Sequence, residues 1–259
     1  MEDARLKEIA DRLDRAERER KAIDPPASGA KLSAADAYRV QMINIERAVA
    51  AGRKIVGRKI GLTSLAMQKM LGVNEPDFGH LFDDMIMQDG SECRTDLLML
   101  PRVEAEIAFV LKRELRGPGI TRADVMAAAD YVTPALEIID TRIRDWKITL
   151  ADTIADNASS ARVVLGAEKS SPTICDLAKV AMTLEKNGVA VEKGLGEAVL
   201  GHPAEPLAWL ANKLAEFGQS LAAGSVIIPG ALCRAIDVAP GDSIVARYDH
   251  LGTVSVRFV

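Results

Sequence analysis

Two glutamates lie two positions apart in a segment of strongly alternating polarity. Glu104 and Glu106 stand in residues 101–110, which read PRVEAEIAFV. Side chains two apart on a β-strand point to the same face and lie about 7 Å from each other, so we expect both carboxylates on one face of a strand. On a buried face such a pair needs a cation between the carboxylates or a proton on one of them. An edge strand with a hydrated glutamate face is the open alternative.

A third glutamate stands alone in an aliphatic segment. Glu137 lies within residues 134–140, which read PALEIID. Isolated buried charges are rare without a partner. Three carboxylates on two neighbouring strands would form an oxygen-rich site suited to Mg²⁺ or Mn²⁺, with positions left for water and substrate. The alternative is that Glu137 pairs with an arginine, and Arg142 and Arg144 are close in sequence.

A lysine between two glycines is a further candidate for chemistry. Lys59 lies between Gly57 and Gly61 in a β-like segment. A lysine on such a strand can approach a ligand closely, as a cation for a carboxylate or as an acid–base group if its pKa falls. A hydrated lysine at a strand end is the alternative. The polar run of residues 156–160 could bind substrate oxygens or form an ordinary turn.

The histidines and cysteines indicate little chemistry of their own. The three cysteines are far apart and contain no C-x-x-C pair, so we expect neither a disulfide framework nor a structural zinc site. The three histidines are equally scattered. His80 and His202 are weak catalytic candidates, and a cysteine nucleophile is unsupported because no histidine lies near a cysteine in sequence.

Length and composition restrict the class of protein. The chain has 259 residues, and 33 basic against 37 acidic side chains give a net charge of −4. At about 150 residues per domain, this length predicts one large domain with a small additional arm. The charge argues against nucleic-acid binding, and no stretch reaches the roughly 18 apolar residues of a membrane span. Residues 1–20 are too highly charged for a secretory signal, so we expect a cytoplasmic protein.

Two amphipathic helices are predicted at the N-terminus, and strands dominate the remainder. The first helix ends before the prolines at 25 and 26; the second begins at Ser33, with Asp36 completing a capping box, and ends at Gly52. We assign residues 1–52 to a helical arm and residues 53–259 to a second, larger unit. Its predicted strands are 54–62, within 98–111, 132–140, a hairpin over 180–193, 225–228, 243–248 and 253–259. Its predicted helices are 64–71, 121–130 and 206–217.

The order of these elements favours an α+β sheet or roll over a doubly wound parallel sheet. The residues Asn187-Gly188 predict the tip of the hairpin. The residues Pro76-Asp77-Phe78-Gly79 predict a turn. The glycine-rich patterns of nucleotide-binding proteins are missing from the sequence.

Six motifs resemble, in this order, those of the 2-keto-4-pentenoate hydratase/4-oxalocrotonate decarboxylase family of the fumarylacetoacetase-like superfamily. They are GRKIGLTS at 57–64, EPDFG at 75–79, PRVEAE at 101–106, ALEIID at 135–140, RDW at 144–146 and ADNAS at 155–159. The resemblance extends from about residue 33 to residue 259. Six ordered motifs are far more specific than any one of them.

The resemblance implies a mixed β-roll with flanking helices for residues 53–259. It implies a divalent metal, Mg²⁺ or Mn²⁺, held by Glu104, Glu106 and Glu137. Family members form homo-oligomers and act in cytosolic meta-cleavage pathways for aromatic compounds, in some cases in a complex with the next pathway enzyme.

The resemblance also implies the residues that act on the substrate. Lys59 and Asp77 would be catalytic. Asp156, Asn157 and Ser159 would bind the substrate, a small 2-oxo or 2-hydroxy acid.

The implied reaction is the metal-dependent addition of water to 2-hydroxypenta-2,4-dienoate. The same electron sink would support decarboxylation of 4-oxalocrotonate or hydration of a longer dicarboxylate such as 2-oxohept-4-ene-1,7-dioate. The motifs EPDFG and RDW resemble the hydratases, whereas EKNG at 185–188 and VLGHP at 199–203 resemble the decarboxylases. The hydratase is favoured because its motifs flank the carboxylates and Lys59. A non-catalytic partner of such an enzyme is the remaining alternative.

Arg162 departs from the hydratase pattern, in which a glycine commonly follows this segment. If its guanidinium faced the pocket, it could bind a second carboxylate, which would favour a dicarboxylate substrate. If it faced solvent, it would carry no such information.

Overall fold

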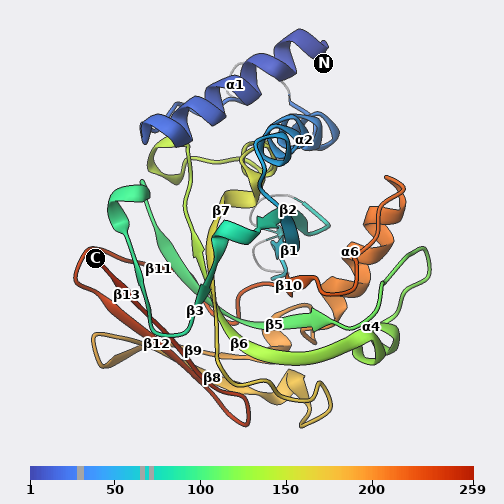
Figure 1. Cartoon of the computed structure of the whole chain (residues 1–259), viewed down its shortest axis with the longest axis vertical. Helices are drawn as coiled ribbons and strands as arrows, with labels where there is room; N and C mark the ends of the chain where they lie inside the picture. Colours follow the sequence, from blue (N-terminus) through green and yellow to red (C-terminus); the bar gives the residue numbers. More distant parts are fainter. Residues whose placement is uncertain (28–31, 65–67, 70–72) are drawn as a thin grey trace.

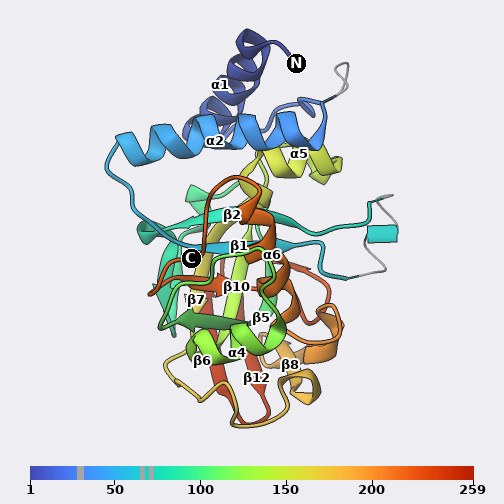
Figure 2. The ribbon, with the colours of Figure 1, turned by 90° about the vertical axis from the view of Figure 1, so that its right-hand side faces the viewer.

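The computed structural model describes residues 1–27, 32–64, 68–69 and 73–259. In these residues two β-sheets pack against each other, with helices around them and a pair of N-terminal helices on one side (Figures 1 and 2). The mixture of sheets and helices agrees with the predicted α+β class. The helix predicted over 64–71 lies mostly outside the described residues.

The larger sheet has eight strands in the order β2-β1-β10-β5-β6-β7-β3, with β11 paired to the start of β5. Its strands are β1 Ile55–Gly61, β2 Asp77–Phe82, β3 Ile86–Gln88, β5 Arg102–Leu111, β6 Ala129–Ile139, β7 Ser160–Leu165, β10 Val226–Ile228 and β11 Ile236–Asp237. β1 runs parallel to β10, whereas the pairs β2–β1, β10–β5 and β5–β6 are antiparallel. The end of β1, the starts of β2 and β5, and the end of β6 therefore meet at one end of the sheet.

The smaller sheet has five strands in the order β4-β13-β12-β8-β9. They are β4 Ser91–Cys93, β8 Ala181–Lys186, β9 Val189–Leu195, β12 Ser243–Tyr248 and β13 Gly252–Phe258. The β8–β9 hairpin turns at Asn187 and Gly188, both with positive φ, as a two-residue hairpin loop requires. This prediction from the sequence is confirmed.

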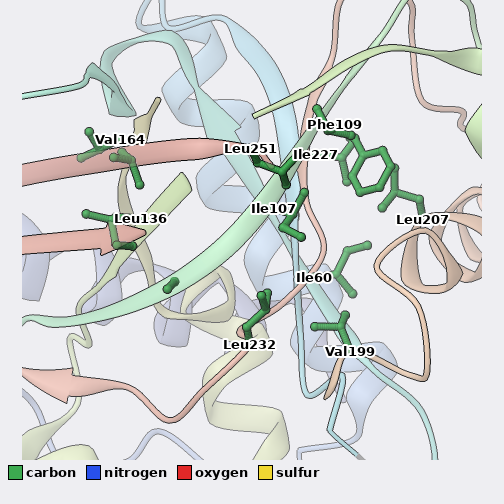
Figure 3. Close-up of a cluster of buried hydrophobic side chains, with 14 of the residues drawn as sticks. Ile60, Ile107, Phe109, Leu136, Val164, Val199, Leu207, Ile227, Leu232 and Leu251 are labelled. Atoms are coloured by element: carbon green, nitrogen blue, oxygen red, sulfur yellow. The ribbon is translucent and has the colours of Figure 1, made fainter. Parts of the chain in front are cut away.

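Alternation along β5 separates an apolar face of the large sheet from a polar one. Ile107 and Phe109 have no exposed surface and pack with Leu136 of β6 in the cluster shown in Figure 3. Because successive side chains on a strand point to opposite faces, Glu104 and Glu106 project from the other side. The core therefore fixes the direction of both glutamates.

The helices are α1 Asp3–Glu19, α2 Ala34–Ala50, α4 Arg122–Ala128, α5 Leu150–Ala155 and α6 Glu205–Ala215. Short 3₁₀ turns are η1 Asp83–Met85, η2 Thr95–Leu97, η3 Arg144–Trp146, η4 Asn157–Ser159, η5 Leu177–Lys179 and η6 Gly196–Ala198. In the described part of the chain, no helix combines the length and apolar character needed to cross a membrane.

The two N-terminal helices pack on α5 and not only on each other. Leu13 of α1 and Val40 of α2 share a buried cluster with Ile154 of α5. The Ser33 hydroxyl accepts the backbone N–H of Asp36 at 3.1 Å, which confirms the predicted start of α2. The Asp36 carboxylate accepts the Ser33 hydroxyl at 2.9 Å and not the Ser33 backbone N–H, so the predicted capping box is wrong in this half. Figure 2 shows α2 lying between α1 and the large sheet. The division at residue 52 into two units stays a prediction.

The turn predicted for residues 76–79 is wrong in part, because Asp77, Phe78 and Gly79 begin strand β2. Tertiary packing explains the difference. Gly79 pairs with Lys59 of β1, and a β-carbon on Gly79 would lie 2.4 Å from the backbone oxygen of Asn157. The glycine is needed for this close approach and not for a turn.

Candidate active site

Three glutamate side chains converge on the polar face of the large sheet. Glu104 of β5 is the direct cross-strand partner of Glu137 of β6, and Glu106 lies two residues farther along β5. Cross-strand partners share a face, so the three side chains point the same way. One carboxylate oxygen of each lies within 4.8 Å of the other two. Glu106 and Glu137 have no exposed surface.

The oxygens of these glutamates fit a hard divalent cation. Oε1 of Glu106 and Oε1 of Glu137 are buried and accept no hydrogen bond from a described residue. Oε2 of Glu106 accepts the backbone N–H of Gly230 at 2.7 Å. A buried acceptor without a donor costs about 1–3 kcal/mol, and more when it is charged. Clustered carboxylate oxygens are the ligands that Mg²⁺ and Mn²⁺ prefer, so the donor set fits the expected group.

Burial, and then crowding, raises the pKa values of these carboxylates. Burial, and then the charge of Glu137, raises the pKa of Glu104 to about 7. Burial, and then the charges of Glu137 and Glu104, raise the pKa of Glu106 well above its ordinary value. Without a compensating cation, the cluster therefore retains protons near neutral pH.

Lys59 is the cationic neighbour of the glutamates. Its side chain is buried, with Nζ 3.3 Å from Oε2 of Glu137 and donating to the backbone oxygen of Ala158 at 2.9 Å. The arginines considered as partners of Glu137 are bound elsewhere, Arg142 to Asp156 and Arg144 to Asp24. Glu137 thus has a lysine as its ionic partner.

The charges around Lys59 determine its protonation. Burial alone would lower the pKa of the lysine, but the charge of Glu137, followed by that of Asp77, raises it above the ordinary value. Lys59 therefore keeps its proton at neutral pH and acts as a fixed positive charge. This differs from a lysine whose pKa is lowered for proton abstraction.

Asp77 lies beside Lys59 at the start of β2. It pairs with Gly61 of β1 and is 2% exposed. A β-carbon on Gly61 would lie 2.2 Å from Oδ1 of Asp77, so the glycine leaves room for the carboxyl group. This Oδ1 is buried and accepts no hydrogen bond from a described residue. Burial raises the pKa of Asp77, and the charge of Lys59 offsets only part of that rise.

The carbonyl group that binds Lys59 belongs to a left-handed turn. Asn157, Ala158 and Ser159 of η4 have φ values of 52°, 51° and 55°. The left-handed region costs about 1–2 kcal/mol for each residue that is not glycine, so other contacts must stabilise the turn. The side chain of Asn157 supplies two of them, with Oδ1 accepting the N–H of His80 at 2.8 Å and Nδ2 donating to its C=O at 3.0 Å.

Asp156 and Ser159 are also bound within the protein. The carboxylate of Asp156 forms a buried ion pair with Arg142 and also accepts the backbone N–H of Arg142 and the hydroxyl of Thr141. The Ser159 hydroxyl lies 3.4 Å from that of Thr153. Within residues 156–159, the backbone oxygen of Ala158 accepts the hydrogen bond from Lys59. These contacts favour a positioning role for Asp156 and Asn157, whose assignment to substrate binding stays a prediction.

Arg162 lies on the other face of the sheet from the glutamates. It is the cross-strand partner of Ile138, whereas Glu137 pairs with Val163. Partners share a face and successive residues alternate, so Arg162 points away from Glu137. Its Nη1 donates to the backbone oxygen of Ala161 at 2.8 Å. This placement does not support contact between Arg162 and a substrate bound at the glutamates.

Gln41 of α2 is a residue of the site that sequence reasoning missed. Its side chain is 1% exposed, donates to the backbone oxygens of Phe78 and Ile154, and contacts the ring of His80. A polar residue beside the apolar positions 38, 42 and 45 of a predicted helix could have indicated a buried hydrogen bond. The sequence offered no indication of its partners.

Comparison with known proteins gives the family. Residues 74–259 match the family described as fumarylacetoacetate (FAA) hydrolase C-terminal. The 2-keto-4-pentenoate hydratase of Paraburkholderia xenovorans is 47% identical over 223 residues, covering 86% of this chain and 83% of that protein. The 2-oxo-hept-4-ene-1,7-dioate hydratase of Escherichia coli is 44% identical over 264 residues, 97% of each chain.

A solved structure agrees over the whole chain. The 4-oxalocrotonate decarboxylase from Pseudomonas putida G7, complexed with magnesium and adipate, superposes with a TM-score of 0.97 at 42% identity, covering 100% of this chain and 99% of that one. The expected fumarylacetoacetase-like fold is confirmed. The chain therefore belongs to the fumarylacetoacetate hydrolase family, in the group that contains 2-keto-4-pentenoate hydratases and 4-oxalocrotonate decarboxylases.

Proposed function

We propose that this chain adds water to 2-hydroxypenta-2,4-dienoate and forms 4-hydroxy-2-oxopentanoate. The observation that carries the proposal is the convergence of three carboxylates, two of them fully buried with unpartnered oxygens, beside a buried ammonium group. The substrate carries a carboxylate next to an enol oxygen, and a hard cation can bind both oxygens at once. Two relatives named as hydratases support the same reaction class.

Glu104, Glu106 and Glu137 would hold the metal, Mg²⁺ or Mn²⁺. When bound, the metal would supply positive charge that stabilises the enolate form of the 2-oxo acid. The hydrogen bond from Gly230 to Glu106 keeps one carboxylate oriented toward the other two. The cross-strand register does the same for Glu104 and Glu137.

Lys59 would bind and orient the substrate with a fixed positive charge. Its Nζ donates to the backbone oxygen of Ala158 and forms an ion pair with the carboxylate of Glu137. An ammonium group has three N–H donors, so one is left for an oxygen of the substrate. Because neighbouring acids raise its pKa, Lys59 is a poor proton donor at neutral pH.

Asp77 would carry the proton that moves. Burial raises the pKa of Asp77 above its ordinary value, so this carboxyl group holds a proton more readily than a hydrated aspartate does. The 2-hydroxyl proton leaves and a proton arrives at C5, which gives an unsaturated 2-oxo acid. Water then loses one proton as its oxygen bonds to C4, and a proton arrives at C3. The sum of these steps is the addition of one water molecule.

Decarboxylation of 4-oxalocrotonate is the second candidate function. The structure of a decarboxylase at a TM-score of 0.97 favours it. In that reaction the distal carboxylate leaves as CO₂, and its bonding electrons enter the same conjugated 2-oxo acid. The three glutamates with their metal and Lys59 would serve both reactions. The residues around the distal end of the bound substrate would therefore decide between the two reactions.

Assays of the pure protein with added Mg²⁺ test the proposal. We expect loss of dienoate absorbance with 2-hydroxypenta-2,4-dienoate and formation of 4-hydroxy-2-oxopentanoate. Release of CO₂ from 2-oxohex-3-enedioate without hydration of the dienoate would select the decarboxylase instead. If the metal-loaded protein catalyses neither reaction, both candidate functions are contradicted.

A further inference from the structure

Gln41 fixes the protonated nitrogen of His80. The amide nitrogen of Gln41 lies 3.1 Å from the backbone oxygen of Phe78 and 2.8 Å from that of Ile154, and only N–H groups can satisfy two carbonyl oxygens. The amide oxygen must therefore face Nδ1 of His80, at 3.1 Å. Since this oxygen can only accept, Nδ1 carries the proton. Burial lowers the pKa of His80 well below its ordinary value, so the ring is neutral and Nε2 is unprotonated.

His80 in turn is bound to the left-handed turn. Its backbone N–H and C=O are both taken by the side chain of Asn157, which is the first residue of η4. The next residue, Ala158, directs its carbonyl oxygen to Nζ of Lys59. Gly79, directly before His80, allows the backbone of Asn157 to pack against β2. An unbroken series of hydrogen bonds and peptide units therefore connects α2 to the lysine.

We propose that Gln41, His80 and Asn157 form a positioning relay through which helix α2 fixes the ammonium group of Lys59 beside the glutamates. The inference rests on the proposed function for its kinetic consequence. The three residues are positioning residues in this relay, because their contacts lead to Lys59. Helix α2 is thereby part of the active-site framework.

The geometry of Lys59 explains why the relay matters. Within the described chain, its Nζ has one hydrogen-bond acceptor, the Ala158 oxygen, and one ionic partner, Glu137, which is a proposed metal ligand. The Ala158 oxygen is thus the contact that holds the ammonium independently of the metal. That oxygen lies in a turn of three left-handed residues, a conformation that relaxes if the contacts of Asn157 to His80 are lost.

Two variants on α2 distinguish the relay from a general role of α2 in holding the N-terminal helices in place. Gln41→Met keeps the length of the side chain and removes its hydrogen bonds. Asn44→Leu removes a comparable amide, which accepts from Arg47 within α2 and donates to the backbone oxygen of Ala10 in α1. We expect kcat to fall about tenfold or more in Gln41→Met, since a displacement of about 1 Å in a positioned group costs up to about 10²-fold. We expect kcat within about twofold of wild type in Asn44→Leu.

Metal binding and a conservative variant exclude a general loss of structure. Titration with Mn²⁺ should give the same affinity for both variants, because neither touches the glutamates. His80→Asn places an amide N–H near the position of Nδ1 and should retain most of kcat, whereas His80→Phe should not. Equal losses of kcat in Gln41→Met and Asn44→Leu would overturn the relay, as would wild-type kcat in Gln41→Met.

Nuclear magnetic resonance tests the relay without any substrate. The chain has three histidines, so the ring nitrogens of His80 can be identified by comparison with His80→Asn. We expect a protonated Nδ1 and an unprotonated Nε2 in wild type. The signal of the Lys59 ammonium should shift in Gln41→Met and stay unchanged in Asn44→Leu; an unchanged signal in both would contradict the relay. If wild-type protein hydrates no dienoate, the proposed function fails, and these signals still decide the relay.

Discussion

Nζ of Lys59 lies 3.3 Å from Oε2 of Glu137, and both side chains are buried in the large sheet. This contact gives Glu137 two tasks, because the same carboxylate belongs to the proposed metal site and holds the lysine. The positive charge of the metal and that of Lys59 would thus share one anionic group. A change at Lys59 should therefore lower turnover while the metal stays bound, whereas a change at Glu137 should weaken both.

Lys59→Met should abolish most turnover while the metal stays bound. The substitution removes a positive charge from the reacting region, and loss of one such stabilising group costs about 10²–10³ in kcat. Metal affinity should not fall, because the lysine repels a dication. Calorimetric titration with Mg²⁺ and an absorbance assay measure the two effects. The control is Lys54→Met, at an exposed position just before β1, and unchanged turnover in Lys59→Met would remove the assigned role.

Glu106→Gln should weaken metal binding and turnover together, yet stabilise the metal-free fold. A neutral amide is a poorer metal ligand than a carboxylate. It also removes a buried acid whose pKa is raised by burial and by the charges of Glu137 and Glu104, and whose Oε1 has no donor in the described residues. The melting temperature without metal should rise, and the increase that Mg²⁺ causes in wild type should disappear. Glu185→Gln on β8, where the carboxylate pairs with Arg247 near the surface, serves as the control. Wild-type metal affinity in Glu106→Gln would contradict the site.

The stability of the metal-free protein should fall as pH rises toward 8. The pKa of Glu104 is raised to about 7 by burial and then by Glu137, against about 4.3 in an unfolded chain. Between these values the folded state binds more protons than the unfolded state, so the free energy of unfolding decreases with increasing pH. Saturating Mg²⁺ should remove this trend, because it displaces the protons from the folded state, and its effect on the melting temperature should grow with pH. The slope should be smaller in Glu104→Gln; an equal slope would refute the assignment.

Local sequence patterns predicted the structure correctly wherever a residue's neighbours in sequence determine its conformation. The period of two along residues 102–111 predicted that Glu104 and Glu106 share a face, as the structure shows. Asn187-Gly188 predicted the hairpin because its turn needs two positive φ angles. Ser33 predicted the start of α2, because its hydroxyl accepts a hydrogen bond from a residue only three positions away in sequence. Each of these is a short-range effect.

Contacts between distant residues could not be predicted in this way. Asp77 and Gly79 were predicted to lie in a turn, because the partner that requires the glycine is Asn157, far away in sequence. The left-handed turn at Asn157 contains no glycine, so its composition gives no sign of positive φ. Nor does the sequence show that Arg142 forms its ion pair with Asp156, so that Lys59 is the ionic partner of Glu137.

Arg162→Gln should leave the preference between mono- and dicarboxylate substrates unchanged. Arg162 points to the face of β7 opposite to that of Glu137 on β6, so a distal carboxylate bound at the glutamate face does not meet it. The measurement is the ratio of kcat/KM for 2-hydroxypenta-2,4-dienoate and 2-oxohex-3-enedioate in both proteins. A selective loss of about tenfold or more for the diacid, the size of a charge-assisted hydrogen bond, would return Arg162 to the substrate site.

Gly79→Ala should destabilise the fold and lower turnover together. The new β-carbon would lie 2.4 Å from the backbone oxygen of Asn157, so β2 and the left-handed turn must separate. Overpacking of this kind costs about 1–3 kcal/mol, which urea unfolding measures. The same movement displaces the Ala158 oxygen from Lys59, so kcat should fall. Gly90→Ala adds the same methyl group where nothing lies within 4 Å, at φ 75°, and should cost about 1–2 kcal/mol with kcat unchanged. Wild-type kcat in a destabilised Gly79→Ala protein would show that the turn does not position the lysine.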